Sequence, residues 1–329
     1  MDIEEIVALS VKHNVSDLHL CDARPARWRK QGKLETAPFN APEVDALLTQ
    51  WLSDSQQEQW RQNRQTDFSV ALADGQRVRV SAFAHQQGAS LAMRILPAVC
   101  PQLEALRPPA AIPELLRREN GLILVTGATG SGKSTTLAAM VGYLNHHQAR
   151  HILTLEDPIE YCYASERCLI QQREIGAHCP SFAAGLRAAL REDPDVILLG
   201  ELRDSETIRL ALTAAETGHL VLATLHTRGA AQAIERLIDT FPAREKDSLR
   251  GQLAGSLQAV LAQKLVDDGC GGRRALFELL INTPAVGNLI REGKTHQLPG
   301  IMQTGQQAGM QTFSHSLQQS QAPGRMQAG

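Results

Sequence analysis

The segment GATGSGKST, at residues 127–135, constrains the fold of this chain more than any other. It matches the pattern G-x-x-x-x-G-K-[ST], follows the apolar run LILVT (122–126), and precedes a helical pattern over 134–146. In that setting the backbone N–H groups of a glycine-rich loop surround phosphate oxygens at the N-terminus of a helix. The segment therefore predicts a phosphate-binding loop, and the alternative is a glycine turn that binds nothing.

Each position of this loop has an expected role. The glycines let the backbone approach a phosphate closely, Lys133 supplies a positive charge, and Ser134 supplies a hydroxyl for Mg²⁺. The residues predicted to bind the nucleotide are Gly127, Ala128, Thr129, Gly130, Ser131, Gly132, Lys133, Ser134 and Thr135.

Apolar runs and helical patterns alternate after the loop. The runs are HILTL (151–155), DVILL (195–199) and LVLATL (220–225), and helical patterns cover 134–146, 205–216 and 246–262. Such alternation is typical of an α/β fold with a mostly parallel sheet. In these sheets the chemistry lies at the carboxyl ends of the strands.

Polar residues follow three of these runs, in the segments LEDPIEY, GELRD and LHT. If the strands lie beside the loop, their ends converge on the γ-phosphate, where an ATPase needs carboxylates for the metal and the attacking water. The acids of interest are Glu160 and Glu201, although any one acid after a strand often only caps a helix. His219 and His226 are either surface histidines or hydrogen-bond donors to a phosphate.

The first part of the chain has a different pattern. Residues 67–96 alternate, as in QRVRVSAFA, and predict an antiparallel meander, whereas the prolines at 97–113 predict a linker. We expect a smaller α+β domain over 1–108 and an α/β domain over 109–313. Residues 314–329, rich in glutamine with glycine and proline, predict a disordered tail.

Composition narrows the classes of partner. Lysine plus arginine number 33 against 35 aspartate plus glutamate, so the basic excess typical of nucleic-acid binding is missing. No apolar run reaches the roughly 18 residues of a membrane span, and we expect a cytoplasmic protein. The six cysteines form no C-x-x-C pair, which favours free thiols over a disulfide framework or a zinc site.

At these residues the chain resembles the secretion ATPases of the type II/type IV pilus (GspE/PulE) superfamily, and most closely its PilT-type retraction ATPases. The shared segments are SDLHL (16–20), RVRVSAF (77–83), GATGSGKST, LEDPIEY, the run at 190–227, and TPAVGNLIREGK (283–294). The resemblance extends to about residue 313.

The resemblance implies a homohexameric ring, built from a PAS-like N-terminal domain and a RecA-like P-loop NTPase domain, that hydrolyses ATP with Mg²⁺. It implies that Glu201 is the catalytic carboxylate that also holds the metal through water, that Glu160 is a second acid, and that Lys133 is the loop lysine. Arg77, Arg79 and Arg94 are similar to arginines that reach ATP in the family, and the alternative is that they are solvated strand residues. The expected partner is an inner-membrane platform protein, with neither nucleic acid nor direct membrane insertion.

Further features of the sequence indicate which branch of the superfamily the chain resembles, the retraction or the extension ATPases. The extra N-terminal domain and four-cysteine module usual in extension ATPases are missing, which favours the retraction branch that drives twitching motility. Against it, Gly287 stands where the PilT-type helix A-I-R-N-L-I-R-E has its first arginine. The first hypothesis is therefore a retraction motor, and the alternative is an ATP-binding regulator or scaffold with little turnover. A nucleic-acid motor is a third reading, which rests on fold alone.

Overall fold

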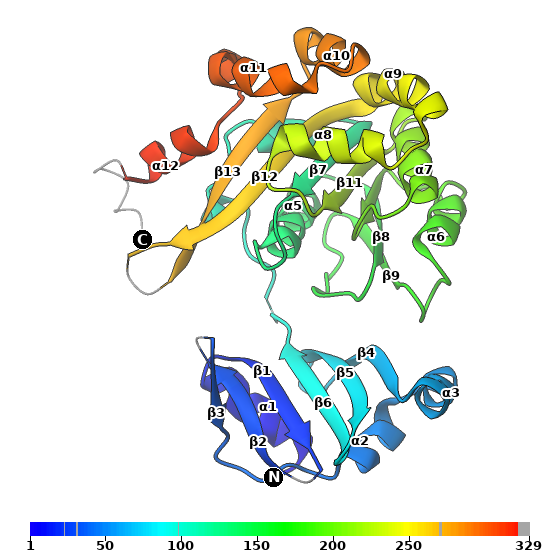
Figure 1. The fold of residues 1–329 in the computed structure, drawn as a ribbon, viewed down its shortest axis with the longest axis vertical. Helices are drawn as coiled ribbons and strands as arrows, with labels where there is room; N and C mark the ends of the chain where they lie inside the picture. Colours follow the sequence, from blue (N-terminus) through cyan, green and yellow to red (C-terminus); the bar gives the residue numbers. More distant parts are fainter. Residues whose placement is uncertain (23, 31, 98, 270–271, 322–329) are drawn as a thin grey trace. The chain divides into compact units, whose positions relative to one another are not determined.

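The computed structural model of the chain describes residues 1–22, 24–30, 32–97, 99–269 and 272–321. The chain divides into two compact units, one of Met1–Val99 with Pro158–Cys162 and one of Cys100–Asp157 with Tyr163–Gly329 (Figure 1). The break lies inside the predicted linker but earlier than the predicted boundary at 108. The physical reason is Leu103, which is only 2% exposed and packs into the core of the second unit.

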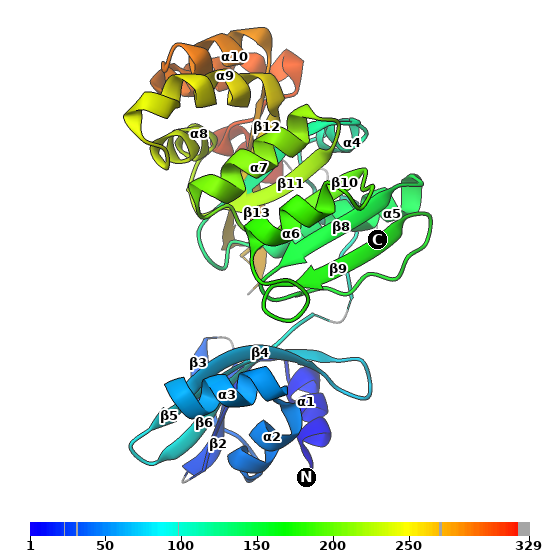
Figure 2. The same cartoon turned by 90° about the vertical axis from the view of Figure 1, so that its right-hand side faces the viewer.

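The first unit is a six-stranded antiparallel sheet in the order β3-β2-β1-β6-β5-β4, with three helices against it (Figure 2). Its strands are β1 (Val15–Cys21), β2 (Arg24–Lys30), β3 (Lys33–Thr36), β4 (Gln65–Ala71), β5 (Arg77–His85) and β6 (Gly88–Ile95). Its helices are α1 (Ile3–Lys12), α2 (Val44–Trp51) and α3 (Asp54–Asn63). The α+β arrangement and the meander over 67–96 are confirmed. Alternate residues such as Val78 and Val80 of β5 are fully buried, as period-two patterning predicts.

The second unit is built on a seven-stranded sheet in the order β13-β12-β7-β11-β10-β8-β9. All neighbouring pairs are parallel except β12 and β13. The strands are β7 (Gly121–Thr126), β8 (His151–Glu156), β9 (Leu169–Glu174), β10 (Val196–Leu199), β11 (Leu220–Leu225), β12 (Leu257–Asp267) and β13 (Arg273–Ile281). This confirms the predicted α/β class with a mostly parallel sheet.

Helices cover both faces of this sheet, which Figure 2 shows with α6 and α7 on one side and α5 on the other. They are α4 (Ile112–Leu116), α5 (Lys133–His147), α6 (Phe182–Ala189), α7 (Ser205–Glu216), α8 (Ala230–Asp239), α9 (Lys246–Ser256), α10 (Pro284–Arg291), α11 (Leu298–Thr304) and α12 (Phe313–Gln321). Two separate apolar cores result, one under α4 and α5 and one under α6 to α11. Strands such as β7 and β11 are buried along their whole length because both faces are covered.

Two predictions about this unit were wrong. The helix predicted over 246–262 ends at Ser256, and Leu257 begins β12, which pairs with both β7 and β13. The apolar run LQAVLAQKLV is compatible with either a helix or a strand. It forms a strand because it pairs with the edges of two neighbouring strands.

The predicted disordered tail was wrong for residues 314–321, which belong to α12. Thr312 caps this helix by accepting a bond from the N–H of His315 (3.3 Å), and the Ser316 hydroxyl accepts the N–H of Phe277 in β13 (3.1 Å). Ser316 is buried in this contact. The rest of the predicted tail, 322–329, lies outside the described residues.

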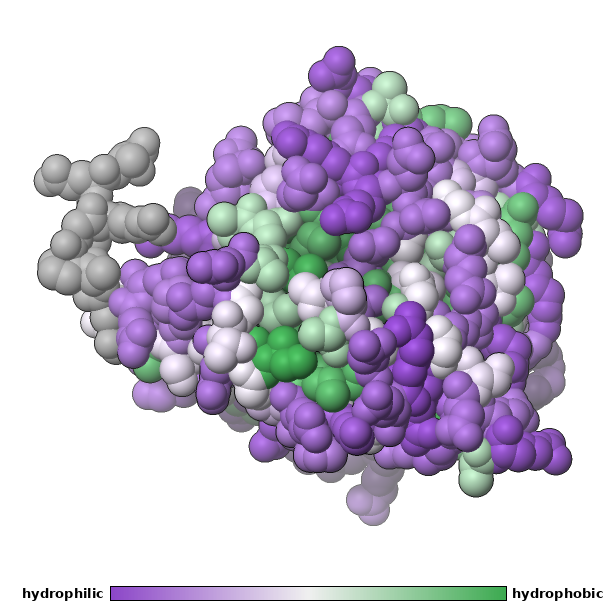
Figure 3. All heavy atoms as spheres, turned by 90° about the horizontal axis from the view of Figure 1, so that it is seen from above, coloured by the Kyte–Doolittle hydropathy of each residue, from purple (hydrophilic) through white to green (hydrophobic). Residues whose placement is uncertain are grey.

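Seen from above, most of the surface is hydrophilic, and hydrophobic residues form small separate patches (Figure 3). Over the described ranges of the chain, no helix has both the length and the apolar character needed to cross a membrane.

Candidate functional site

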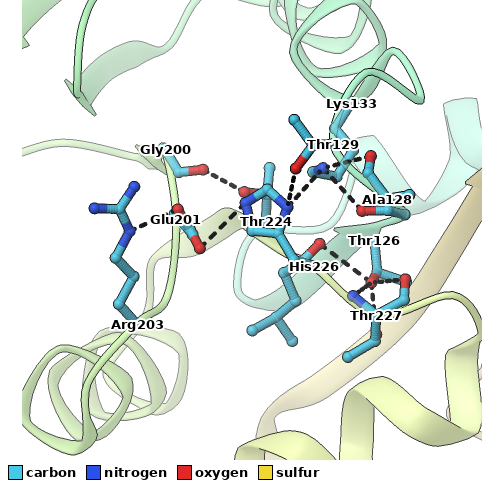
Figure 4. Close-up of polar contacts among 12 residues, drawn as sticks. Thr126, Ala128, Thr129, Lys133, Gly200, Glu201, Arg203, Thr224, His226 and Thr227 are labelled. Atoms are coloured by element: carbon cyan, nitrogen blue, oxygen red, sulfur yellow. Dashed lines mark hydrogen bonds and ion pairs between the residues drawn. The ribbon is translucent and has the colours of Figure 1, made fainter.

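The strand order of the second unit brings three predicted segments together. β7 leads into the glycine-rich loop, β10 ends before Glu201, and β11 lies between these two strands and ends before His226. All three strands run parallel, so their carboxyl ends lie at one edge of the sheet. Figure 4 shows His226 between Glu201 and Lys133 at this edge.

Two glycines of the loop are required by its backbone path. At Gly127, where φ is +158°, a Cβ would collide with the Ser131 hydroxyl and with the carbonyl of Gln263. Gly132 has a left-handed backbone, with φ of +88°, and is the N-cap of α5. Of the residues between them, Ala128, Thr129 and Gly130 are exposed and Ser131 is buried. The loop therefore has the form of a phosphate cradle, open to solvent at its tip.

Lys133 is the first residue of α5 and is only 8% exposed. Its Nζ donates to the carbonyl oxygens of Gly127 (2.9 Å) and Ala128 (3.1 Å), and it lies 3.3 Å from Nδ1 of His226. The ammonium thus folds back on its own loop. To reach a phosphate it must exchange some of these bonds for phosphate oxygens.

His226 bridges the lysine and the predicted catalytic acid. Its Nε2 lies 3.2 Å from Oε1 of Glu201, whose Oε2 accepts a bond from Nε of Arg203 (2.7 Å). Lys133 can only donate, so Nδ1 of His226 accepts and Nε2 carries the proton donated to Glu201. The side chain of Glu201 is 19% exposed and that of His226 is 42% exposed. Arg203, Glu201, His226 and Lys133 form one connected row of polar contacts.

Threonines hold the ends of the three strands in place. The Thr126 hydroxyl lies 2.6 Å from that of Thr227, and the N–H of Thr227 donates to Thr126 Oγ1 (3.0 Å). Thr224 donates from its hydroxyl to the carbonyl of Gly200, and its own carbonyl accepts the N–H of Leu202 (3.0 Å). These bonds fix His226 and Glu201 relative to the loop. They explain why the segment TLHT, at the end of an apolar strand, has three polar residues.

Sequence reasoning missed two residues that support the site. Gln263 of β12, 2% exposed, donates from Nε2 to the carbonyl of Ser131 (2.6 Å). Glu278 of β13 accepts the N–H of Ala230 at the start of α8 (2.9 Å), and burial raises the pKa of its carboxyl. Each is a polar residue flanked by an apolar run of its strand, and this was the available signal.

His219 is the other histidine of the predicted site. It precedes β11, and Leu220 pairs with Gly121 at the amino end of β7. Its Nδ1 lies 3.1 Å from the carbonyl of Ala214. The phosphate loop follows the opposite end of β7, so His219 lies away from the loop of its own chain, and its nucleotide role stays a prediction. His219 and His226 occupy the two ends of one strand.

The three predicted arginines and Glu160 belong to the first unit. Arg77 donates to the carbonyl of Ile159 (2.8 Å) and to the Ser69 hydroxyl (2.7 Å), while Arg94 pairs with Asp17 (2.9 Å).

Arg79 lies opposite Arg94 in the β5–β6 pair, and Glu160 lies in Pro158–Cys162, half-buried. The nucleotide roles of these four residues stay predictions.

The exposed positions at the loop suit a nucleotide and a metal ion. Ser134 is exposed in the first turn of α5, where a hydroxyl can meet a cation beside a phosphate. In the part of the chain that the structure describes, no three histidine, cysteine, aspartate or glutamate side chains gather as a ready metal site.

Comparisons with known proteins agree with this arrangement. Residues 2–327 match the family model described as type II/IV secretion system protein. The chain is 73% identical to the uncharacterized protein YggR of Escherichia coli K12, covering 99% of this chain and 100% of that protein. It is 47% identical to the type IV pilus retraction ATPase PilT of Pseudomonas aeruginosa, covering 96% and 93%. A crystal structure of the pilus retraction motor PilT with bound ADP superimposes with a TM-score of 0.86 at 39% identity, covering 98% of each chain.

Proposed function

Because this chain belongs to the type II/IV secretion system protein family, we propose that it is a P-loop ATPase that acts as the motor of a type IV pilus or a related secretion platform, with pilus retraction as its work. The observation that carries the proposal is the row from Lys133 through His226 to Glu201, on three adjacent strand ends. It unites a phosphate cradle, a lysine and a carboxylate at one edge of the sheet.

The chain's own groups divide the work of ATP hydrolysis. The N–H groups of the loop and Lys133 bind the phosphates, and Ser134 would hold Mg²⁺, which would supply positive charge beside the phosphates during transfer of the terminal phosphoryl group to water. Glu201 accepts a hydrogen bond from the attacking water and orients it. Its bond to Arg203 keeps one carboxylate oxygen fixed while the other faces His226.

His226 has a distinct role in this scheme. In the structure it donates to Glu201 and accepts from Lys133, so it holds the two together without a nucleotide. When Lys133 turns to a phosphate, Nδ1 of His226 loses that donor. We infer that His226 reports the state of the γ-phosphate to the strand end that carries Glu201.

We further propose a homohexameric ring in which Arg77, Arg79, Arg94 and Glu160 complete the site. Their support is the family resemblance and their charge, since three arginines on adjacent strands suit a polyphosphate. In this proposal the ring sits at the cytoplasmic face of the membrane and drives a platform protein, with each closure around ATP doing mechanical work.

Phosphate release by the purified chain with ATP and Mg²⁺ tests the catalytic part. Complementation of a strain that lacks its pilus retraction ATPase, read as twitching zones, tests the motor part, with Lys133→Ala as the inactive control. Turnover without complementation would assign the chain to another secretion platform. ATP binding without turnover would instead favour the regulator or scaffold.

A further inference from the structure

We propose that Gln263 is a positioning residue that holds the phosphate loop in its binding conformation. The inference rests on the proposed ATPase function. Gln263 lies on β12, directly after Ala262, which pairs with Thr126 at the end of β7. It therefore sits beside the first residue of the loop. No nucleotide-binding pattern in the sequence includes it.

Residues at both ends of the loop lie close to Gln263. The Gln263 carbonyl occupies the space that a Cβ on Gly127 would need. Its Nε2 donates to the carbonyl of Ser131 (2.6 Å) and lies 3.1 Å from where a Cβ on Gly132 would stand. Both ends of the loop thus contact Gln263, and a larger residue at either glycine would break the fit.

The bond to Ser131 sets the direction of the next N–H group. In a trans peptide the C=O and the following N–H point in opposite directions. Because the Ser131 carbonyl points to Gln263, the N–H of Gly132 points away from β12. In a phosphate cradle this N–H faces the anion, and a reversed peptide would present a carbonyl that repels phosphate. Gln263 therefore favours binding without touching the ligand.

A glutamine with a purely structural role is expected to have hydrogen-bond partners for both the oxygen and the nitrogen of its amide group. Gln263 is 2% exposed, and its Oε1 has no hydrogen-bond partner among the described residues. Leaving a buried acceptor unpaired destabilises a fold, and an apolar residue of the same shape would avoid that cost. The amide is retained in an apolar strand in spite of this cost, as expected if its donor serves the loop.

The test compares Gln263→Met with Gln311→Met. Gln311 is a matched control because it is also buried and donates its amide to a backbone carbonyl, that of Phe277 (3.1 Å), away from the loop. The full chain is titrated with a fluorescent ATP analogue and, by competition, with ADP. Thermal melting is recorded with and without ADP.

We expect Gln263→Met to raise the Kd for ATP and ADP about tenfold, with a melting temperature without nucleotide close to that of wild type, because the variant removes the unpaired Oε1 but also takes the donor from the Ser131 carbonyl. The shift in melting temperature on adding ADP should shrink, because stabilisation by a ligand follows its Kd. Gln311→Met should keep the wild-type Kd. Values of Kd within twofold of wild type for Gln263→Met would overturn the inference.

If Gln263→Met does not fold, a second variant tests the inference in its place. Gln263→Asn keeps the amide but is one methylene too short to reach Ser131, so it should show the same weakened binding. Wild-type affinity in Gln263→Asn would then overturn the inference. Failure of the wild-type chain to bind ATP is a different result, since it would contradict the proposed function and not the role of Gln263.

Discussion

His226 Nε2 lies 3.2 Å from Oε1 of Glu201, and the same imidazole reaches Lys133 on its other side. The contact exists because β11 separates β7 from β10, so the residue after β11 stands between the phosphate loop and the acid. This places a group that can change hydrogen-bond partners between the site of binding and the site of catalysis.

The bridge predicts a change in His226 when nucleotide binds. Without nucleotide the proton should reside on Nε2, because Nδ1 accepts from Lys133. Once Lys133 turns to phosphate, Nδ1 loses this donor and keeps the Thr129 hydroxyl, 3.5 Å away, as its hydrogen-bond partner. Long-range ¹H–¹⁵N correlation spectra of labelled histidines should show the Nε2–H tautomer in the free chain and an altered Nδ1 shift with a non-hydrolysable ATP analogue. His226→Asn assigns the signal, and an Nδ1–H tautomer in the free chain would contradict the contact.

Lys133 should control affinity. Removing its ammonium in Lys133→Ala deletes the charge that meets the phosphates, so nucleotide binding should fall at least a hundredfold. Isothermal titration with ADP measures the loss. Lys246→Ala is a suitable control, because Lys246 pairs with Asp239 at the surface of α9 and should leave binding as it is. Equal affinities in the two variants would remove Lys133 from the site.

Glu278 gives the chain a pH-dependent stability. Burial raises the pKa of its carboxyl in the folded state, so this group favours folding most below its unfolded pKa near 4.5. That stability is lost as the pH rises through the folded pKa. Glu278→Gln keeps an oxygen acceptor for the N–H of Ala230. The variant should therefore gain stability over wild type between pH 4.5 and pH 8.

Urea unfolding at several pH values measures the effect of Glu278→Gln. Glu35→Gln, at an exposed position of β3, is the control. The difference from wild type should grow with pH for Glu278→Gln only. A difference that is constant across pH would show that Glu278 is not the titrating group.

Gly287 should tolerate a side chain with a gain in stability. It lies inside α10, buried against α9, and a Cβ there would be 3.4 Å from Oδ1 of Asn282 and 3.6 Å from the carbonyl of Ala254. These contacts are close to ordinary ones, so Gly287→Ala should stabilise the chain by about 0.5–1 kcal/mol through helix propensity. Thermal melting of Gly287→Ala measures it. A lower melting temperature would mean that α9 and α10 need the glycine for their packing.

The sequence predicts features that depend on local patterns better than features that depend on contacts between residues far apart in the chain. The phosphate loop, β7, β8, β10 and β11 follow from local patterns, and the helix that the resemblance implies in TPAVGNLIREGK is present as α10. The strand β12 was mistaken for a helix because only its neighbours β7 and β13 distinguish the two. The same cause hid Gln263, whose role comes from a contact with Ser131 far along the chain.

The predicted site shows the same limit. Glu201 and His226 follow adjacent parallel strands, and the pattern of acid and histidine after apolar runs was enough to predict that the two residues lie close together. His219 lies in the same motif, but strand direction carries it to the far edge of the sheet. The prediction of a disordered tail was wrong for another reason. The helix α12 gains its stability by packing on β13 despite its polar sequence.

The central claim is that Glu201 drives hydrolysis and the loop binds nucleotide independently of it. The direct measurement is a single-turnover assay in which excess chain is mixed with radiolabelled ATP and Mg²⁺, for wild type and Glu201→Ala. Wild type should convert all bound ATP to ADP, whereas ATP should stay bound and intact on Glu201→Ala. Equal hydrolysis by both proteins, or bound ATP left intact by wild type, would contradict the central claim.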